Sequence, residues 1–199
     1  GPRREVRIDF SGQPARSRFD ISGGEQDIME MKKFNDEVMY PDEDIVKVRN
    51  EDIRHLKELS RKNPRQRIRL CAHKNVDESV HEMLIVHARD AYVRPHRHIC
   101  KAESFHVVEG SLFVVVYDDR QNVAEVIPMG DYSSGRVFYY RISAGIYHTM
   151  VIESDFVVFH ESTAGPFKKE QTEFAPWSPD EKDIARVGNF MDELRRKTS

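Results

Sequence analysis

Three histidines and one glutamate have the types and spacing of a metal site. His96 and His98 are two residues apart, so on a strand both side chains would leave the same face. Glu103 follows after a short turn, and His148 opens another expected strand just after Gly145. Three imidazoles and one carboxylate suit divalent iron, manganese, nickel, cobalt or zinc, with positions left for water. The sequence therefore predicts a divalent metal ion held by His96, His98, Glu103 and His148.

Three further polar side chains are candidate catalytic residues near that ion. Tyr92 and Arg94 share strand parity with the first two histidines, so we expect them to face the same interior. An inward arginine needs a partner, because an unpaired buried charge is costly. Arg94 could clamp a substrate carboxylate or phosphate, or form a salt bridge with an interior carboxylate such as Glu82 or Glu109. Tyr140 is a candidate hydroxyl donor, while strand parity directs His106 outward and Cys100 is expected to be a bystander.

Short strands are the elements that must position these side chains. Between residues 67 and 162, segments rich in Val, Ile, Phe and Tyr alternate with Gly, Asp, Asn and Ser. Many short strands at such intervals predict a mainly β chain with an antiparallel sandwich or barrel. Residues 109–111 and 118–122 have the composition of hairpin turns.

Helices are expected outside the strand-rich region. Residues 1–24 predict a loose arm, and residues 25–33 a short helix. Asn50 could cap a helix that ends at Asn63 and Pro64. Near the end of the chain, Ser178 to Glu181 form a capping box with proline at the first helical position. An apolar stripe follows and predicts a C-terminal helix that packs on the strands or on a partner subunit.

The metal-ligand segment resembles the first motif of the cupin superfamily, G(X)5HXH(X)3,4E(X)6G. Its two histidines, glutamate and last glycine match His96, His98, Glu103 and Gly110, while its first glycine falls on Asp90. The second motif, G(X)5PXG(X)2H(X)3N, is partly kept. Gly145 and His148 match it, and its other positions fall on Val137, Ser143 and Ile152. The departures affect turn residues and leave the ligand positions intact.

A closer likeness runs over roughly residues 65–180. The segments 94–98, 138–142, 147–151, 164–167 and 175–179 look like those of the WbuC group of cupin metalloproteins. The resemblance implies a cupin-type antiparallel β-barrel (a double-stranded β-helix or jelly roll) over residues 65–165. An N-terminal arm with a helix (1–64) and a C-terminal extension with a helix (166–199) would flank it. It also implies a bound metal, a homodimer using the N-terminal arm, and a setting in surface-polysaccharide biosynthesis.

Composition excludes several classes of protein and partner. Hydrophobic residues make up 39% and charged residues 33% of the 199 residues, with a net charge of −3 and no basic block. Nucleic acid is therefore not an expected partner. No apolar run is long enough for a membrane span, and no signal peptide is visible. Two cysteines, Cys71 and Cys100, make no disulfide framework and fit a reducing cytoplasm.

Two functions from different classes fit these features. The first is a metal-dependent enzyme that acts on a small polar molecule such as a sugar, either an isomerase or epimerase or a non-haem iron dioxygenase. The second is a non-catalytic module in which the metal organises a pocket for a sugar or an acid. A purely structural metal is disfavoured, because structural sites are usually closed by protein ligands.

Overall fold

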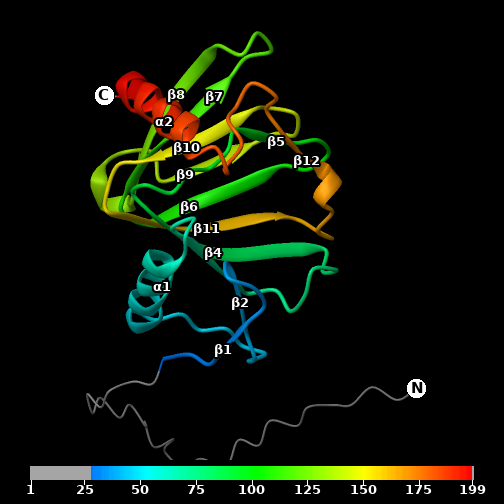
Figure 1. Cartoon of the computed structure of the whole chain (residues 1–199). Helices are drawn as coiled ribbons and strands as arrows, with labels where there is room; N and C mark the ends of the chain where they lie inside the picture. Colours follow the sequence, from blue (N-terminus) through cyan, green and yellow to red (C-terminus); the bar gives the residue numbers. More distant parts are fainter. Residues whose placement is uncertain (1–27, 199) are drawn as a thin grey trace, which may run out of the picture.

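Two β-sheets form the framework of the molecule (Figure 1). The computed structural model describes residues 28–198. The larger sheet has seven strands, in the order β1 (Met31–Lys33), β2 (Val38–Pro41), β3 (Arg67–Cys71), β4 (Val80–Ala88), β11 (Phe156–Ala164), β6 (Glu103–Glu109) and β9 (Tyr139–Ile142). The smaller sheet has five, in the order β12 (Thr172–Phe174), β5 (His96–His98), β10 (His148–Ile152), β7 (Ser111–Tyr117) and β8 (Val123–Gly130).

The main hydrophobic core lies between these two sheets. Phe105 and Phe159 come from the larger sheet, and Leu112, Val114 and Met150 from the smaller one; all are buried in one cluster. Strand pairing is antiparallel except for β2 with β3. The expected mainly β class is therefore confirmed as two packed sheets. A closed barrel is not seen in residues 28–198, and the double-stranded β-helix stays a prediction.

The turn at residues 109–111 corrects the hairpin expected there. It joins β6 of the larger sheet to β7 of the smaller one, so the chain crosses between layers instead of pairing back on itself. Gly110 makes the crossing possible, with φ of +85°. A Cβ there would lie 2.2 Å from the carbonyl oxygen of Phe156, which no side chain tolerates. Residues 118–122 do join the paired strands β7 and β8, as expected.

Helix α1 (Asn50–Lys62) covers the outer face of the larger sheet. Its Leu56 is fully buried against Ile68 and Val86 of that sheet. The helix runs to the predicted end, but Asn50 is its first helical residue and not its cap. Asp52 supplies the capping interaction instead, since its Oδ2 accepts a hydrogen bond from the Arg49 backbone N–H at 2.7 Å.

Helix α2 (Ile184–Thr198) covers the outer face of the smaller sheet. It buries Met191 and Leu194 against residues of β7 and β10. The helix begins later than expected from Ser178 to Glu181. Ser178 Oγ donates instead to the Ala175 carbonyl at 2.7 Å, and Asp183 accepts from the Arg186 N–H at the actual start.

The N-terminal expectations are only partly within the described residues. Residues 1–27, and with them the loose arm, lie outside. Within 28–33, the expected short helix is wrong, because Met31–Lys33 forms strand β1. The domain boundaries after residues 64 and 165 stay a prediction, although β2 and β12 each join a sheet with central strands.

Candidate metal centre

The two sheets meet at the predicted ligands. His96 and His98 lie on β5 and His148 opens β10, and the pairing of these strands places His96 directly opposite His148. Glu103 opens β6 in the other sheet. The imidazoles therefore come from one layer and the carboxylate from the other.

Backbone carbonyls orient two of the histidines. Nδ1 of His96 lies 2.9 Å from the Arg94 carbonyl oxygen, and Nδ1 of His148 lies 3.0 Å from that of Ile146. A carbonyl can only accept, so each Nδ1 carries the proton and donates it. Each Nε2 then presents an unprotonated lone pair, the form in which imidazole binds metals.

Glu103 lies between two imidazole nitrogens. Its Oε1 is 2.9 Å from Nε2 of His148 and its Oε2 is 2.9 Å from Nε2 of His98, with the glutamate only 5% exposed. Nε2 of His148 is buried and has no aligned hydrogen-bond partner, although Oε1 is so close. In the neutral imidazole a lone pair therefore faces a carboxylate oxygen. A cation between the two atoms would satisfy both of them.

The structure brings three of the four predicted ligands into one cluster. Ligand atoms of His96, Glu103 and His148 all lie within 4.8 Å of one another, and these residues could hold a metal ion. His98 is joined to this cluster through Glu103. Its Nδ1 lies 3.1 Å from Oγ1 of Thr172 on β12, so it too is held on its Nδ1 side.

Burial and mutual charge set the ionisation of the cluster. Burial alone would raise the pKa of Glu103, but the adjacent imidazoles of His148 and His98 outweigh it and hold that pKa well below its usual range. Burial lowers the pKa of His96 to about 4, with His148 as the next cause. Burial also opposes protonation of His148, but contact with Glu103 raises its pKa overall. The donor set is thus a carboxylate with a neutral His96, which suits a divalent cation.

A cavity of about 760 Å³ opens onto the cluster. Its wall includes all four predicted ligands together with Arg94 and Glu161. Burial and the charge of Glu103 raise the pKa of Glu161 to about 7, while Arg69 and Lys101 oppose that shift. The sequence reasoning missed Glu161. The signal was its parity with Phe159 and Thr163 on one strand, which directs it toward the interior.

Arg94 borders the cavity but is already paired. It donates to Asp180 at 3.0 Å and to Ser178 Oγ at 3.0 Å, so the salt-bridge alternative holds with a different carboxylate from Glu82 or Glu109. That partner comes from the C-terminal extension, whose path over the cavity was not evident from strand parity. Asp180 would therefore compete with a substrate anion for the guanidinium of Arg94.

The two predicted catalytic tyrosines do not border this cavity. Tyr92 packs in the outer cluster with α2 and donates to the Pro179 carbonyl at 3.0 Å, so parity with His96 did not hold before strand β5. Tyr140 is buried against Phe105, and its hydroxyl has no partner among the described residues. Burial, then the charge of Glu103, raises the pKa of Tyr140. The catalytic roles of Tyr92, Arg94 and Tyr140 stay predictions.

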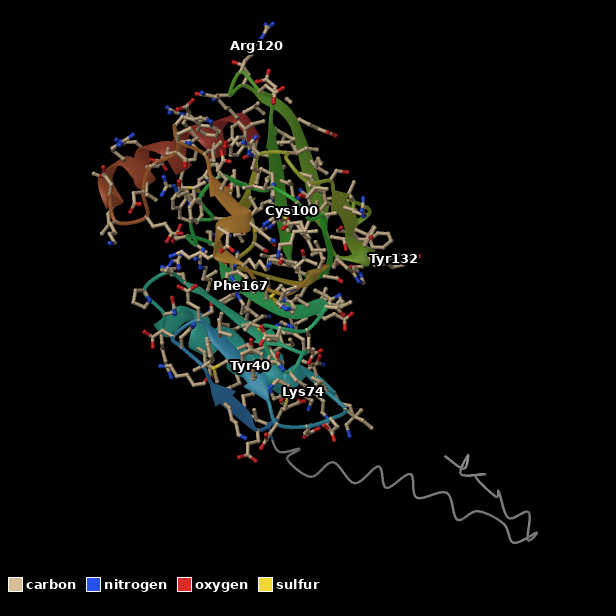
Figure 2. All side chains as sticks on the ribbon, turned by 90° about the vertical axis from the view of Figure 1, so that its right-hand side faces the viewer. Tyr40, Lys74, Cys100, Arg120, Tyr132 and Phe167 are labelled. Atoms are coloured by element: carbon tan, nitrogen blue, oxygen red, sulfur yellow. The ribbon has the colours of Figure 1, made fainter. Side chains whose placement is uncertain are left out.

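Two residues set aside from the sequence are exposed. His106 points out of the larger sheet, and Cys100 lies at the surface in the turn after β5 (Figure 2). No helix within residues 28–198 is long and apolar enough to cross a membrane.

Comparison with protein families gives one match. Residues 48–129 match the family described as a domain of unknown function, DUF6016, which is less than half of the chain. No curated protein sequence matches the chain.

Several solved structures are distantly similar to part of this chain. A protein from Shewanella oneidensis is 12% identical, with a TM-score of 0.44 over 62% of this chain and 77% of that one. The capsular polysaccharide assembling protein CapF from Staphylococcus aureus is 18% identical, with a TM-score of 0.44 over 53% of this chain and 31% of CapF. Pac13 from Streptomyces, solved with uridine, is 14% identical, with a TM-score of 0.40 over 53% of this chain and 79% of Pac13. Likenesses this distant leave the function to be argued from the site itself.

Proposed function

We propose that this chain is a metal-dependent enzyme of the cupin type that acts on a small polar molecule, such as a sugar or a surface-polysaccharide intermediate. The observation that carries the proposal is the orientation of the imidazoles. His96 and His148 are fixed by Nδ1 donation to carbonyls, and the bare Nε2 of His148 faces Glu103 without an aligned hydrogen bond. Such anchoring of the other ring nitrogen is characteristic of metal-binding histidines.

His96, His98, Glu103 and His148 would hold the ion. A divalent ion bound there would supply a Lewis acid to a carbonyl or hydroxyl of the substrate. The protein would contribute a cavity large enough for a small molecule and a carboxyl group, Glu161, in its wall. Glu161 can hold or release a proton near neutral pH, since its pKa is raised to about 7.

A non-catalytic, metal-organised binding module is the second candidate. One observation favours it: the hydroxyl groups of Tyr92 and Tyr140, expected to transfer protons, lie outside the cavity wall. Glu161 is the residue that separates the two candidates. An enzyme would lose turnover on Glu161→Gln, whereas a binding module would keep its affinity for ligand.

Metal content tests the proposal directly. The purified protein is expected to carry about one equivalent of a divalent metal by elemental mass spectrometry. The double substitution His96→Ala/His148→Ala should remove it, because two of three clustered donors are lost. His106→Ala, which changes an exposed histidine on β6, is the matched control and should keep the metal. A full equivalent of metal in the double variant would contradict the assignment of these residues as metal ligands.

The identity of the metal separates the possible reactions. Iron together with oxygen consumption would favour a non-haem iron dioxygenase. Zinc, nickel, cobalt or manganese without oxygen consumption would favour an isomerase or epimerase, or simple binding. We further propose a WbuC-type protein that works in the cytoplasm as a homodimer.

A further inference from the structure

Three arginines at alternate positions of one segment approach the metal-site cavity. Arg65, Arg67 and Arg69 alternate with Gln66 and Ile68 along the chain, and all three arginines border the cavity. On β3 the intervening Ile68 points to the other side, into the cluster beneath helix α1. Strand alternation thus directs the apolar side chain toward helix α1 and the cationic side chains toward the metal site.

Carboxylates of the chain neutralise most of this positive charge. Arg65 and Arg67 each pair with Glu37, at 2.8 and 2.9 Å, and both also contact Glu181. Arg94, in the segment just before β5, pairs with Asp180. These guanidinium groups are engaged before any ligand arrives.

Among the four arginines that border the cavity, Arg69 is the exception. It is half-buried, and within residues 28–198 it forms no ion pair. Its guanidinium makes a weak contact from Nη1 to Sδ of Met83 at 3.9 Å. A half-buried guanidinium without a carboxylate at ion-pair distance is only partly compensated, and a ligand oxyanion would supply the missing partner.

The neighbouring acid does not supply the missing partner. Glu161 also borders the cavity, and Arg69 acts on it through charge without an ion pair being formed. The charge of Arg69 is therefore left available to a molecule in the cavity.

We propose that the cavity binds a small molecule carrying an oxyanion group, a carboxylate or a phosphate, and that the Arg69 guanidinium binds this group. The planar fork of arginine can donate two parallel hydrogen bonds to either oxyanion. The rest of the molecule extends toward His96, Glu103 and His148, a part of the inference that rests on the proposed function. Arg69 thereby takes the clamp role that the sequence offered to Arg94.

Calorimetric titration of the full chain with inorganic phosphate and, separately, with acetate tests this inference. Both are titrated at low ionic strength into the wild type, Arg69→Gln, Arg69→Lys and Arg120→Gln. Arg120 is the matched control, because it lies at the outer tip of the β7–β8 hairpin, well separated from Phe167 at the cavity (Figure 2). If phosphate binds the wild type more tightly than acetate, the natural oxyanion is a phosphate. If acetate binds more tightly, it is a carboxylate.

Arg69→Gln should weaken binding of that anion roughly tenfold or more, since a charge-assisted pair is lost. Arg69→Lys should weaken it less, because the charge remains without the fork, and Arg120→Gln should not change it. Arg69→Lys also decides the matter if the glutamine variant fails to fold. Unchanged affinity in the Arg69 variants, or no binding of either anion to the wild type, would overturn the inference.

Metal content measured on the same samples keeps the two proposals apart. Loss of anion binding in Arg69→Gln with full metal supports the Arg69 site. Anion binding that disappears in His96→Ala/His148→Ala yet persists in Arg69→Gln would show the anion on the metal instead, and would overturn the Arg69 site while leaving the metal centre standing.

Discussion

At the scale of single residues, two carbonyl groups decide which nitrogen each key histidine presents. The Arg94 and Ile146 carbonyls lie two residues before His96 and His148, so the orienting contact comes from the segment that leads into each strand. The spacing of His96, His98, Glu103 and His148 predicted that the four would converge, and three of them do so in one cluster. Spacing could not predict that His98 is joined to the others through Glu103, because that depends on side-chain rotamers.

His87 gives a prediction for acid stability. This histidine is buried against Phe159, and burial, then Arg69 and Arg65, lowers its pKa to about 3. Between the ordinary pKa of about 6.5 and the folded value, the unfolded chain takes up a proton that the folded protein refuses. Stability should therefore fall as pH drops through this range.

We expect His87→Leu to reduce the loss of unfolding free energy between pH 7 and pH 5 by roughly 1–2 kcal/mol. Urea denaturation at both pH values measures it. His106→Gln, at an exposed position, should leave the pH dependence as in the wild type. An unchanged pH dependence in His87→Leu would contradict the assigned ionisation.

At the scale of elements, the alternation of apolar and polar residues predicted most strands. The remaining elements depend on contacts between segments distant in the sequence. The parity argument was sound for Glu103 to Glu109, where residues 103, 105 and 107 are buried and 106 and 108 are exposed. It failed between Tyr92 and His96, because no strand precedes β5 there. The helix expected over residues 25–33 was wrong in its described part because Met31–Lys33 pairs with β2, a contact that no local propensity reports.

Asp52 in helix α1 links the start of that helix to Met29, which lies just before strand β1. A substitution can test this link. Its Oδ1 accepts from the Met29 N–H and its Oδ2 from the Arg49 N–H, both at 2.7 Å, and the side chain is fully buried. Asp52→Ala leaves both donors without a partner, so we expect a loss of about 2–3 kcal/mol in unfolding free energy.

Chemical denaturation measures this loss as a lower midpoint. Glu51→Ala is the neighbouring control, since Glu51 pairs with Arg54 on the surface and should cost less than about 0.5 kcal/mol. Equal midpoints for the two variants would show that the hydrogen bonds of Asp52 to Met29 and Arg49 do not stabilise the fold.

At the scale of the whole molecule, the homodimer is a prediction. The larger sheet ends in strand β9, whose outer side has no paired strand among the described residues. Tyr132, Phe138 and Tyr139 are exposed near this edge, and Tyr132 projects from the surface in Figure 2. An open edge with exposed aromatic side chains is typical of an interface.

Light scattering is expected to give about twice the chain mass of 23.3 kDa. Removing residues 1–27 should shift the mass to that of one chain if the N-terminal arm makes the contact. Tyr139→Lys is the companion variant, and a shift there alone would place the interface at β9 instead. A single-chain mass for the intact protein would rule out the dimer.

The division of the ligands between layers links metal affinity to the packing of the whole sandwich. Glu103 belongs to one sheet and the histidines to the other, so the distance between their donor atoms is set by how closely the layers approach. That approach is fixed by large side chains such as Phe105, Leu112 and Met150. A core substitution that lets one layer slide by a fraction of an ångström would therefore change which cation fits, without altering any atom that touches it.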